Sequence, residues 1–313
     1  MEVKNATHVS LFTLSGLQDE TRQSRYAIFF AMLLCYFLIV IVNVTLIVTI
    51  LQEKTLQEPM YIFLCNMCIN TLYGTAGFYP KFSYDILSEH HVISYVGCII
   101  QVCMIYLSFP IDFNILTVMA FDRYVAICRP LEYHSIMTSR NVAILVILCW
   151  VPPILYECLI ISLTYRLTLC GSHIDKLYCE NWSIVRLSCS PTTVNNVVGL
   201  IIITAYLFHV FFIIHTYVKL IQTCLKSSDG RHKFLQTCLP HLFSLINATV
   251  ALLFDMLYSR YRTENFQQGL RNFLALEFLI FPPILNPLFY GIQLTKVREA
   301  VFRRYRRQTQ VIF

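Results

Sequence analysis

Met119-Ala-Phe-Asp-Arg-Tyr-Val-Ala-Ile-Cys128 is the stretch of this sequence that decides the fold, because it places Asp122 and Arg123 side by side at the end of a long apolar run. A helix from Cys98 to Arg123 would be about 37 Å long. The hydrocarbon core of a bilayer is about 30 Å thick. The sequence therefore predicts a membrane-spanning helix with Asp122 and Arg123 at one face of the membrane and Cys98 at the other.

The composition indicates the same environment. Of the 313 residues, 57% are hydrophobic and 13% are charged, whereas charged residues make up about 25% of an ordinary soluble domain. The net charge of +6 is spread between segments and forms no basic block. We therefore expect a membrane protein with no nucleic acid among its partners.

Seven weakly charged runs are each long enough to cross a bilayer as a helix. They cover residues 26–51, 59–80, 94–127, 142–162, 195–221, 234–258 and 273–292. A modest excess of Lys and Arg on the side of Arg123 places that side in the cytoplasm and the N-terminus outside. The first run is too long for a signal-peptide core, so we expect it to remain as an anchor. Within this run, Asn43 is expected to hydrogen-bond a neighbouring helix.

The chain divides accordingly into an extracellular N-terminus (1–25), a seven-transmembrane bundle (26–293) with a long loop at 163–194, and a cytoplasmic tail (294–313). The fold class is an all-α membrane protein. In the N-terminus, Asn5-Ala6-Thr7 is a glycosylation sequon outside the membrane. In the tail, apolar and basic residues alternate with helical spacing, which predicts a short amphipathic helix on the lipid of the inner leaflet.

Four motifs resemble those of the odorant receptors, a branch of the rhodopsin-like (class A) G-protein-coupled receptors. The first stretch extends to Tyr133 and is similar to M-A-F-D-R-Y-V-A-I-C-x-P-L-x-Y. The other three are Pro59-Met60-Tyr61, His232-Lys-Phe-Leu-Gln-Thr-Cys-Leu-Pro-His-Leu242 and Pro282-Pro-Ile-Leu-Asn-Pro-Leu-Phe-Tyr290. The resemblance covers nearly the whole chain and implies seven transmembrane helices followed by a short helix 8.

The same resemblance implies a function. An odorant receptor binds a small odorant within the bundle and activates a heterotrimeric G protein of the Gs or Golf type, which raises cAMP in the cilia of olfactory sensory neurons. Residues 72–81 and Arg260 are similar to the water-borne, fish-type branch, which implies a water-soluble odorant. No enzyme is expected, because Asp112, Glu157, Asp255 and Glu277 are scattered by depth and lack a nucleophile motif.

Eight residues are predicted to act in coupling to the G protein. Arg123 paired with Asp122 is interpreted as a latch that holds the guanidinium in the resting state, against the alternative of a merely structural ion pair. The resemblance implies that Tyr290 swings inward to meet Tyr217 on activation, next to the kink at Pro287. The full set is Asp122, Arg123, Tyr124, Tyr217, Lys233, Asn286, Pro287 and Tyr290.

Four cysteines, Cys98, Cys170, Cys179 and Cys189, lie on the side predicted to be extracellular, where disulfides form. Four cysteines allow three pairings, and the sequence cannot choose among them. The family resemblance implies Cys98 with Cys179 and Cys170 with Cys189, so that the loop covers the mouth of the bundle.

Asp112 lies near mid-membrane, where an acid is costly unless it is protonated, paired or bound to a metal. The resemblance implies a sodium ion there, with Asn70, Thr71, Ser108 and Asn286 as neighbours; no other cofactor is expected. The competing interpretation is a neutral, hydrogen-bonded Asp that joins helices. Thr71 stands where the family usually has an aspartate, so one expected sodium ligand is missing.

The ligand cavity is expected between the outer halves of the third, fifth, sixth and seventh spans. Arg260 can hold a carboxylate through two parallel hydrogen bonds, or it can simply extend toward the membrane surface. Asp255 and Glu277 also leave room for an amine-bearing or zwitterionic ligand. The predicted lining is Ile105, Tyr106, Phe109, Ile202, Ala205, Ala251, Met256, Arg260 and Glu277, a mainly apolar set with a few polar anchors.

Two other functions compete with the odorant receptor. A related class A receptor for a lipid, hormone or peptide is the nearer one. A seven-helix transporter or channel is further off, because it would need charged pathways on several helices or an internal repeat.

Overall fold

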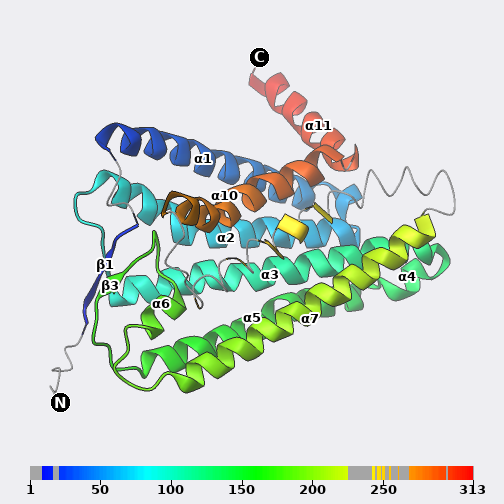
Figure 1. Ribbon diagram of the computed structural model, residues 1–313. Coiled ribbons are helices and arrows are strands. Elements are labelled where there is room, and N and C mark those ends of the chain that lie inside the picture. Colours follow the sequence, from blue (N-terminus) through cyan, green and yellow to red (C-terminus); the bar gives the residue numbers. More distant parts are fainter. Residues whose placement is uncertain are drawn as a thin grey trace.

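The computed structural model describes residues 9–16, 21–224, 242–243, 245–247, 249–250, 254, 260, 268–293 and 295–312. Long helices lying side by side make up most of this part of the chain (Figure 1): α1 (Arg22–Gln52), α2 (Pro59–Leu87), α3 (Tyr95–Cys128), α5 (Ser139–Tyr165), α7 (Thr193–Cys224) and α10 (Gln268–Gln293). Short helical segments connect them: η1 (Lys54–Leu56), η2 (Pro130–Glu132), α4 (Tyr133–Ile136) and α6 (Asn181–Val185). The predicted sixth span, residues 234–258, falls mostly outside the described residues.

Local sequence fixes where these helices begin. The side-chain oxygens of Thr21, Ser94 and Thr138 each accept a hydrogen bond from the backbone N–H three residues further on, at the starts of α1, α3 and α5. Such caps satisfy N–H groups that the helix itself leaves without a partner. Pro59 opens α2, where its missing N–H costs nothing. Because of these signals, α1 and α5 begin a few residues earlier than their apolar runs.

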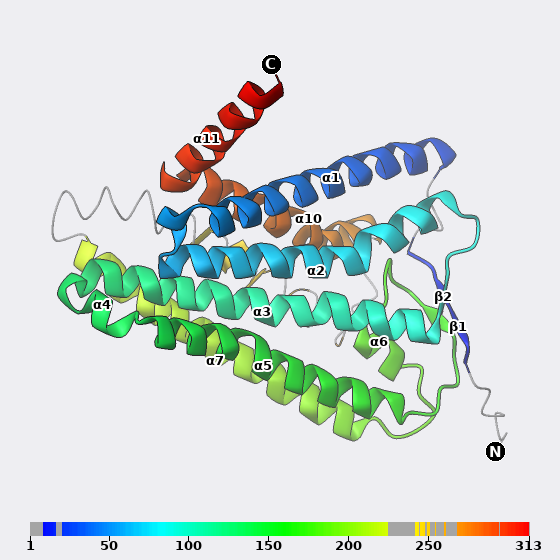
Figure 2. The same cartoon turned by 180° about the vertical axis from the view of Figure 1, so that it is seen from behind.

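Four of the described helices are long and apolar enough to cross a membrane: α1, α3, α5 and the Thr193–Lys219 part of α7. Large apolar side chains such as Leu34 and Phe211 are exposed on their outer faces, at 61% and 68%. The helix α2 lies between α1 and α3 (Figure 2) and has buried residues along its whole length. Because protein covers so much of α2, it can carry polar residues and need not be as apolar as its neighbours.

Close packing of α2 on α3 depends on a small residue. A Cβ atom at Gly77 would lie 2.5 Å from the Cβ of Met104. Small residues allow two helix backbones to approach each other in this way. The two helices are consequently held in one relative position.

A small sheet that the all-helical prediction did not include lies at one end of the bundle, which we call the disulfide end. The strand β1 (Leu11–Leu14) is central, with β2 (Val92–Ser94) antiparallel on one side and β3 (His173–Ile174) parallel on the other. Phe12 and Leu14 point inward and are 0% and 4% exposed. The alternation of exposed and buried residues along β1 is that of a half-buried strand. Residues 11–14 thus pair with the segments that precede α3 and follow α5.

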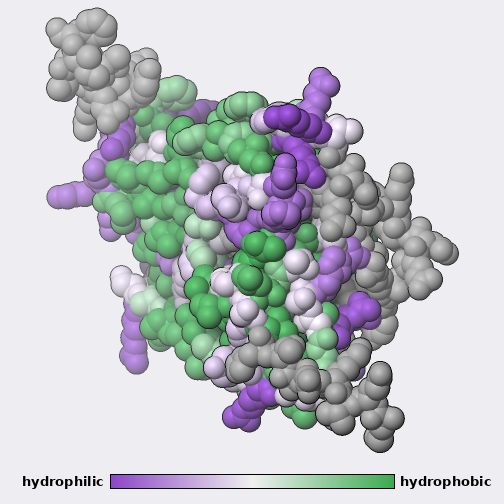
Figure 3. All heavy atoms as spheres, turned by 90° about the vertical axis from the view of Figure 1, so that its left-hand side faces the viewer, coloured by the Kyte–Doolittle hydropathy of each residue, from purple (hydrophilic) through white to green (hydrophobic). Residues whose placement is uncertain are grey.

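Seen from the disulfide end, hydrophilic side chains lie among hydrophobic ones (Figure 3). Glu89 and His90 are exposed in the turn between α2 and β2. The loop after α5 runs from residue 166 to residue 192, so it is shorter at both edges than the predicted 163–194.

The opposite end, which we call the Arg123 end, carries α4 and the start of α11 (Thr295–Ile312). Figures 1 and 2 show α11 leaving the end of α10 at an angle to the bundle. Val297 and Ala300 of α11 are 0% and 2% exposed. Lys296 Nζ donates to Glu58 Oε1 at 2.6 Å. The start of α11 therefore packs against the bundle, whereas Phe302, further along the helix, is 63% exposed.

Candidate functional site

At the Arg123 end, both oxygens of the Asp122 carboxylate are bound. Arg123 donates to Oδ2 from Nη2 at 2.6 Å and from Nε at 3.0 Å, and the Tyr133 hydroxyl of α4 donates to Oδ1 at 2.8 Å. Asp122 is 0% exposed. Burial, followed by the neighbouring Asp122 carboxylate, raises the pKa of Tyr133, so its hydroxyl keeps the proton that it donates. The three side chains form one closed cluster.

Of the other predicted coupling residues, some are buried in or packed on the core, and others lie outside the described residues. Tyr217 of α7 is 4% exposed and belongs to the core, and Tyr124 packs on the same core. Asn286 is 3% exposed, one residue before Pro287 inside α10. The backbone of Tyr290 is helical, whereas Lys233 lies outside the described residues, as does the side chain of Tyr290.

Asp112 is held by α2. Asn70 Nδ2 donates to Asp112 Oδ1 at 2.7 Å and to the carbonyl oxygen of Ser108 at 2.7 Å. Thr71, where the family usually has an acid, is buried beside Asn70. In the described ranges, no cluster of three or more His, Cys, Asp or Glu side chains could hold a metal ion. The contacts match the hydrogen-bonded interpretation of Asp112, and sodium binding stays a prediction.

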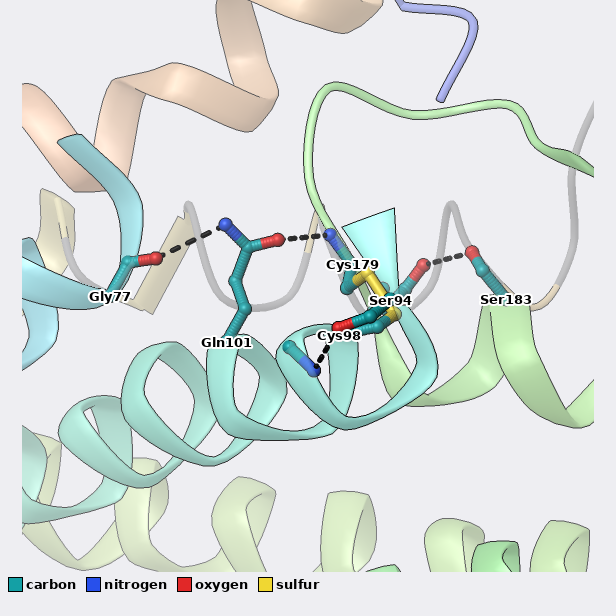
Figure 4. The surroundings of a disulfide bond; sticks show 8 residues. Gly77, Ser94, Cys98, Gln101, Cys179 and Ser183 are labelled. Carbon is teal, nitrogen blue, oxygen red and sulfur yellow. Dashed lines mark hydrogen bonds between the residues drawn. A yellow bond between two sulfur atoms is a disulfide. The ribbon is translucent and has the colours of Figure 1, made fainter. Parts of the chain in front are cut away.

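Two disulfides tie the long loop to the bundle. Cys98 pairs with Cys179, and Cys170 pairs with Cys189; these are the pairs that the family resemblance implied. Gln101, one turn below Cys98, accepts from the backbone N–H of Cys179 at 2.9 Å and donates to the carbonyl oxygen of Gly77 at 3.1 Å (Figure 4). One side chain of α3 therefore joins α2 to the loop next to the disulfide.

A cavity of about 100 Å³ lies just inside the disulfide end, between α3, α5, α6 and α7. Its apolar walls come from Pro110, Ile160, Ile202 and Ile203. Its polar groups are Tyr106, Tyr156, Glu157, Glu180, Asn181, Trp182, Tyr206 and Arg260, and Gly199 completes the lining. An apolar site with a few polar anchors suits a small organic molecule.

Arg260 is oriented from two sides. Its Nη1 donates to Asn196 Oδ1 at 2.6 Å, and its guanidinium lies 4.3 Å from the centre of the Trp182 ring. A Cβ atom at Gly199 would lie 1.8 Å from Arg260 Nη2, so glycine provides the space that the guanidinium occupies. Stacking on Trp182 is favourable for a planar cation. These contacts place the guanidinium of Arg260 in the wall of the cavity.

Three of the predicted lining residues, Tyr106, Ile202 and Arg260, line this cavity. Phe109 packs beside Tyr106, with 6.0 Å between the ring centres. Two assignments need correction: Ile105 is 0% exposed in a core cluster with α2, and Ala205 is exposed on α7. Both lie on a helix one position from a cavity-lining residue, and one position turns a side chain by about 100°.

The remaining predictions concern the seventh span and the sixth. Glu277 of α10 is partly buried and does not belong to the described cavity, and Ala251 and Met256 lie outside the described residues. The predicted cavity had the seventh span as a wall, whereas the cavity here has α5. Sequence reasoning missed Tyr156, Glu157 and Trp182. A signal for Glu157 was present, since an acid within an apolar span is expected to face the interior.

Comparisons with known proteins agree with this architecture. The family model for the olfactory receptor matches residues 32–308. Olfactory receptor 1D2 of Pongo pygmaeus is 32% identical over 97% of this chain and 96% of its own length. Human olfactory receptor 6N1 is 31% identical over 98% of both chains, and human olfactory receptor 10H4 is 29% identical over 98% of both. The chain belongs to the olfactory receptor family: it is an odorant receptor and not an enzyme, with a seven-transmembrane helix bundle and a short helix 8.

Proposed function

We propose that this receptor detects small, water-soluble odorants that carry a carboxylate, and that the carboxylate binds Arg260 in the cavity between α3, α5, α6 and α7. The observation that carries the proposal is the placement of Arg260, which lines the cavity while Asn196 and Trp182 hold its guanidinium in position. A guanidinium can bind a carboxylate through two parallel hydrogen bonds. The apolar walls then take the hydrocarbon part of the odorant.

The binding signal reaches the Arg123 end as a shift between two states. An agonist that favours the open form releases Arg123 from Asp122 and creates a site for a G protein of the Gs or Golf type, which raises cAMP. A differential affinity of about 5.5 kcal/mol would move the equilibrium from 1:99 to 99:1, and partial activation needs less. The closed cluster of Asp122, Arg123 and Tyr133 represents the resting side of this equilibrium.

The proposal includes an orientation. The disulfide end faces the outside of the cell, where disulfides form, and Asn5 carries a glycan. The Arg123 end faces the cytoplasm, and basic residues of α11 contact the anionic lipid of the inner leaflet. The expected cellular site is the cilium of an olfactory sensory neuron. In unpermeabilised cells, an antibody against a tag placed before residue 1 should bind, and one against a tag after residue 313 should not.

A cell-based cAMP assay tests the ligand class. Carboxylic acids from butanoic to octanoic acid are compared with their methyl esters, which have similar shape and no charge. The acids should activate the wild-type receptor, and Arg260→Gln should weaken their potency by about tenfold or more, because hydrogen bonds to a charged group are lost. Equal potency of acids and esters would refute the carboxylate preference.

Coupling is tested separately with Arg123→Ala. This variant should reach the cell surface and give no cAMP response, because the residue that the latch releases is missing. Arg140→Ala is a matched control, since Arg140 is exposed near the start of α5 at the same end. Normal cAMP output from Arg123→Ala would refute the latch.

A further inference from the structure

Glu157 is a buried acid that neither the fold nor the coupling mechanism uses. It lies in the outer half of α5 and is 6% exposed. Its side chain lines the cavity, and Glu157 Oε1 is buried with no hydrogen-bond partner among the described residues. An acid inside a membrane-spanning helix is costly, and a buried acceptor without a donor adds to that cost. A ligand that donates a hydrogen bond would satisfy this oxygen.

Three neighbouring polar side chains of the cavity already have partners. The hydroxyls of Tyr156 and Tyr206 are bonded to each other. Glu180 is bound by Lys176 Nζ at 2.6 Å and by the Ser183 hydroxyl at 2.8 Å. The two glutamates of the cavity thus differ within the described ranges, because Glu180 has a cation beside it and Glu157 Oε1 lacks even a neutral donor.

The cavity also contains an unsatisfied donor. Trp182 Nε1, on the residue that stacks against Arg260, is buried and has no hydrogen-bond partner in the part of the chain that the structure describes. The region of Arg260 and Trp182 therefore offers donors to a ligand, and Glu157 offers an acceptor. The cavity therefore presents both hydrogen-bond donors and an acceptor. Apolar side chains such as Ile202 and Ile203 complete its walls.

We propose that Glu157 is the binding site for a protonated amine of the odorant, so that the cavity accepts amine-bearing and amphoteric ligands. This inference rests on the proposed function only in taking the same cavity as the odorant site. An ammonium group fits better than a hydroxyl, because it donates up to three hydrogen bonds and supplies the positive charge that a buried carboxylate lacks. The apolar walls take the hydrocarbon chain.

The test compares primary amines from butylamine to octylamine, together with phenethylamine, with the alcohol of the same carbon skeleton. In the wild-type receptor, each active amine should raise cAMP with at least about tenfold higher potency than the corresponding alcohol. This comparison needs no variant, so it does not depend on the folding of one. Equal potency of amines and alcohols, or no response to any amine, would overturn the assignment.

Variants then locate the amine. Glu157→Gln keeps the shape and removes the charge, and it should abolish the preference for amines over alcohols. Glu157→Asp should retain part of that preference. The control is Glu89→Gln, the same substitution at an exposed position of the disulfide end. An amine preference that survives in Glu157→Gln, with surface expression verified by flow cytometry, would place the amine elsewhere and overturn the proposal.

The two ligand proposals can fail separately. If acids act through Arg260 and amines show no preference, the carboxylate site stands and the Glu157 site falls. If amines act through Glu157 and acids match their esters, the reverse holds. Aminocaproic acid, which carries both groups at opposite ends of one chain, should lose potency in each of the two variants if both sites exist.

Discussion

The Tyr133 hydroxyl donates to Asp122 Oδ1 at 2.8 Å, on the opposite side of the carboxylate from the Arg123 guanidinium at Oδ2. Tyr133 belongs to α4, which follows α3 after only the short turn η2. The segment between α3 and α5 is therefore connected to the same carboxylate that holds Arg123. Any movement of this segment changes how firmly Asp122 retains Arg123.

Removing the Tyr133 hydroxyl should raise the basal activity of the receptor. In Tyr133→Phe, Asp122 loses one of its donors, so the closed state is destabilised by about 1.5 kcal/mol, a typical value for a hydrogen bond to a charged group. Basal cAMP without odorant, normalised to surface expression, measures this effect. Tyr165→Phe is the control, because the Tyr165 side chain is 72% exposed. Unchanged basal cAMP in Tyr133→Phe would mean that the bond does not restrain the latch.

Enlarging Gly77 should destabilise the bundle. In Gly77→Ala the new methyl group would collide with Met104 Cβ, and overpacking of this kind costs about 1–3 kcal/mol. The melting temperature of purified receptor in detergent measures the change. Ala76→Val adds bulk one position away, on an exposed face of α2, and should leave the melting temperature nearly unchanged. A melting temperature of Gly77→Ala equal to or above that of the wild type would contradict the role of this contact, because alanine by itself favours a helix more than glycine does.

Replacing Gln101 should loosen the loop over the cavity. Gln101→Leu removes the bonds to Gly77 and Cys179, which together contribute about 2 kcal/mol. We expect a lower melting temperature and faster amide hydrogen exchange at Cys179, with the disulfide still formed. Gln57→Leu, at an exposed position of the other end, serves as the comparison. Protection at Cys179 equal to that of the wild type would contradict the role of Gln101.

In the hydrogen-bonded interpretation of Asp112, sodium has no specific effect there, because Asn70 already donates to Asp112 Oδ1. The melting temperature should therefore be equal in sodium chloride and in choline chloride at the same ionic strength. A sodium-dependent rise that disappears in Asp112→Asn would instead establish the sodium site that the family resemblance implies.

Sequence reasoning succeeded where one residue determines its own environment. Asn43 was expected to bond a neighbouring helix, because an amide in lipid needs a partner, and its Nδ2 donates to the carbonyl oxygens of Ile39 in its own helix and Pro283 in α10. The pairing of Asp122 with Arg123 follows equally from their adjacency. In both cases a costly polar group in an apolar segment restricts the arrangements that are open to it.

Prediction failed where contacts between segments far apart in the sequence determine the structure. The pairing of β1 with β2 and β3 joins residues separated by about 80 and 160 positions along the chain, and strands this short give almost no periodic signal. Ile105 and Ala205 were assigned to the cavity from helices of the right kind, but their orientation depends on the rotation of each helix against its neighbours. An acid such as Glu157 within an apolar span is expected to face the interior, but which helices surround it depends on packing.

The hydrogen bonds of β1 to both β2 and β3 have a practical consequence for anyone handling this receptor. The strand β1 begins at Leu11, so a reporter or purification handle inserted directly before it would lie beside the loops that surround the cavity. A bulky fusion there would crowd the route by which odorants arrive. A fluorescent protein or affinity handle is better attached behind α11, where it is remote from that route.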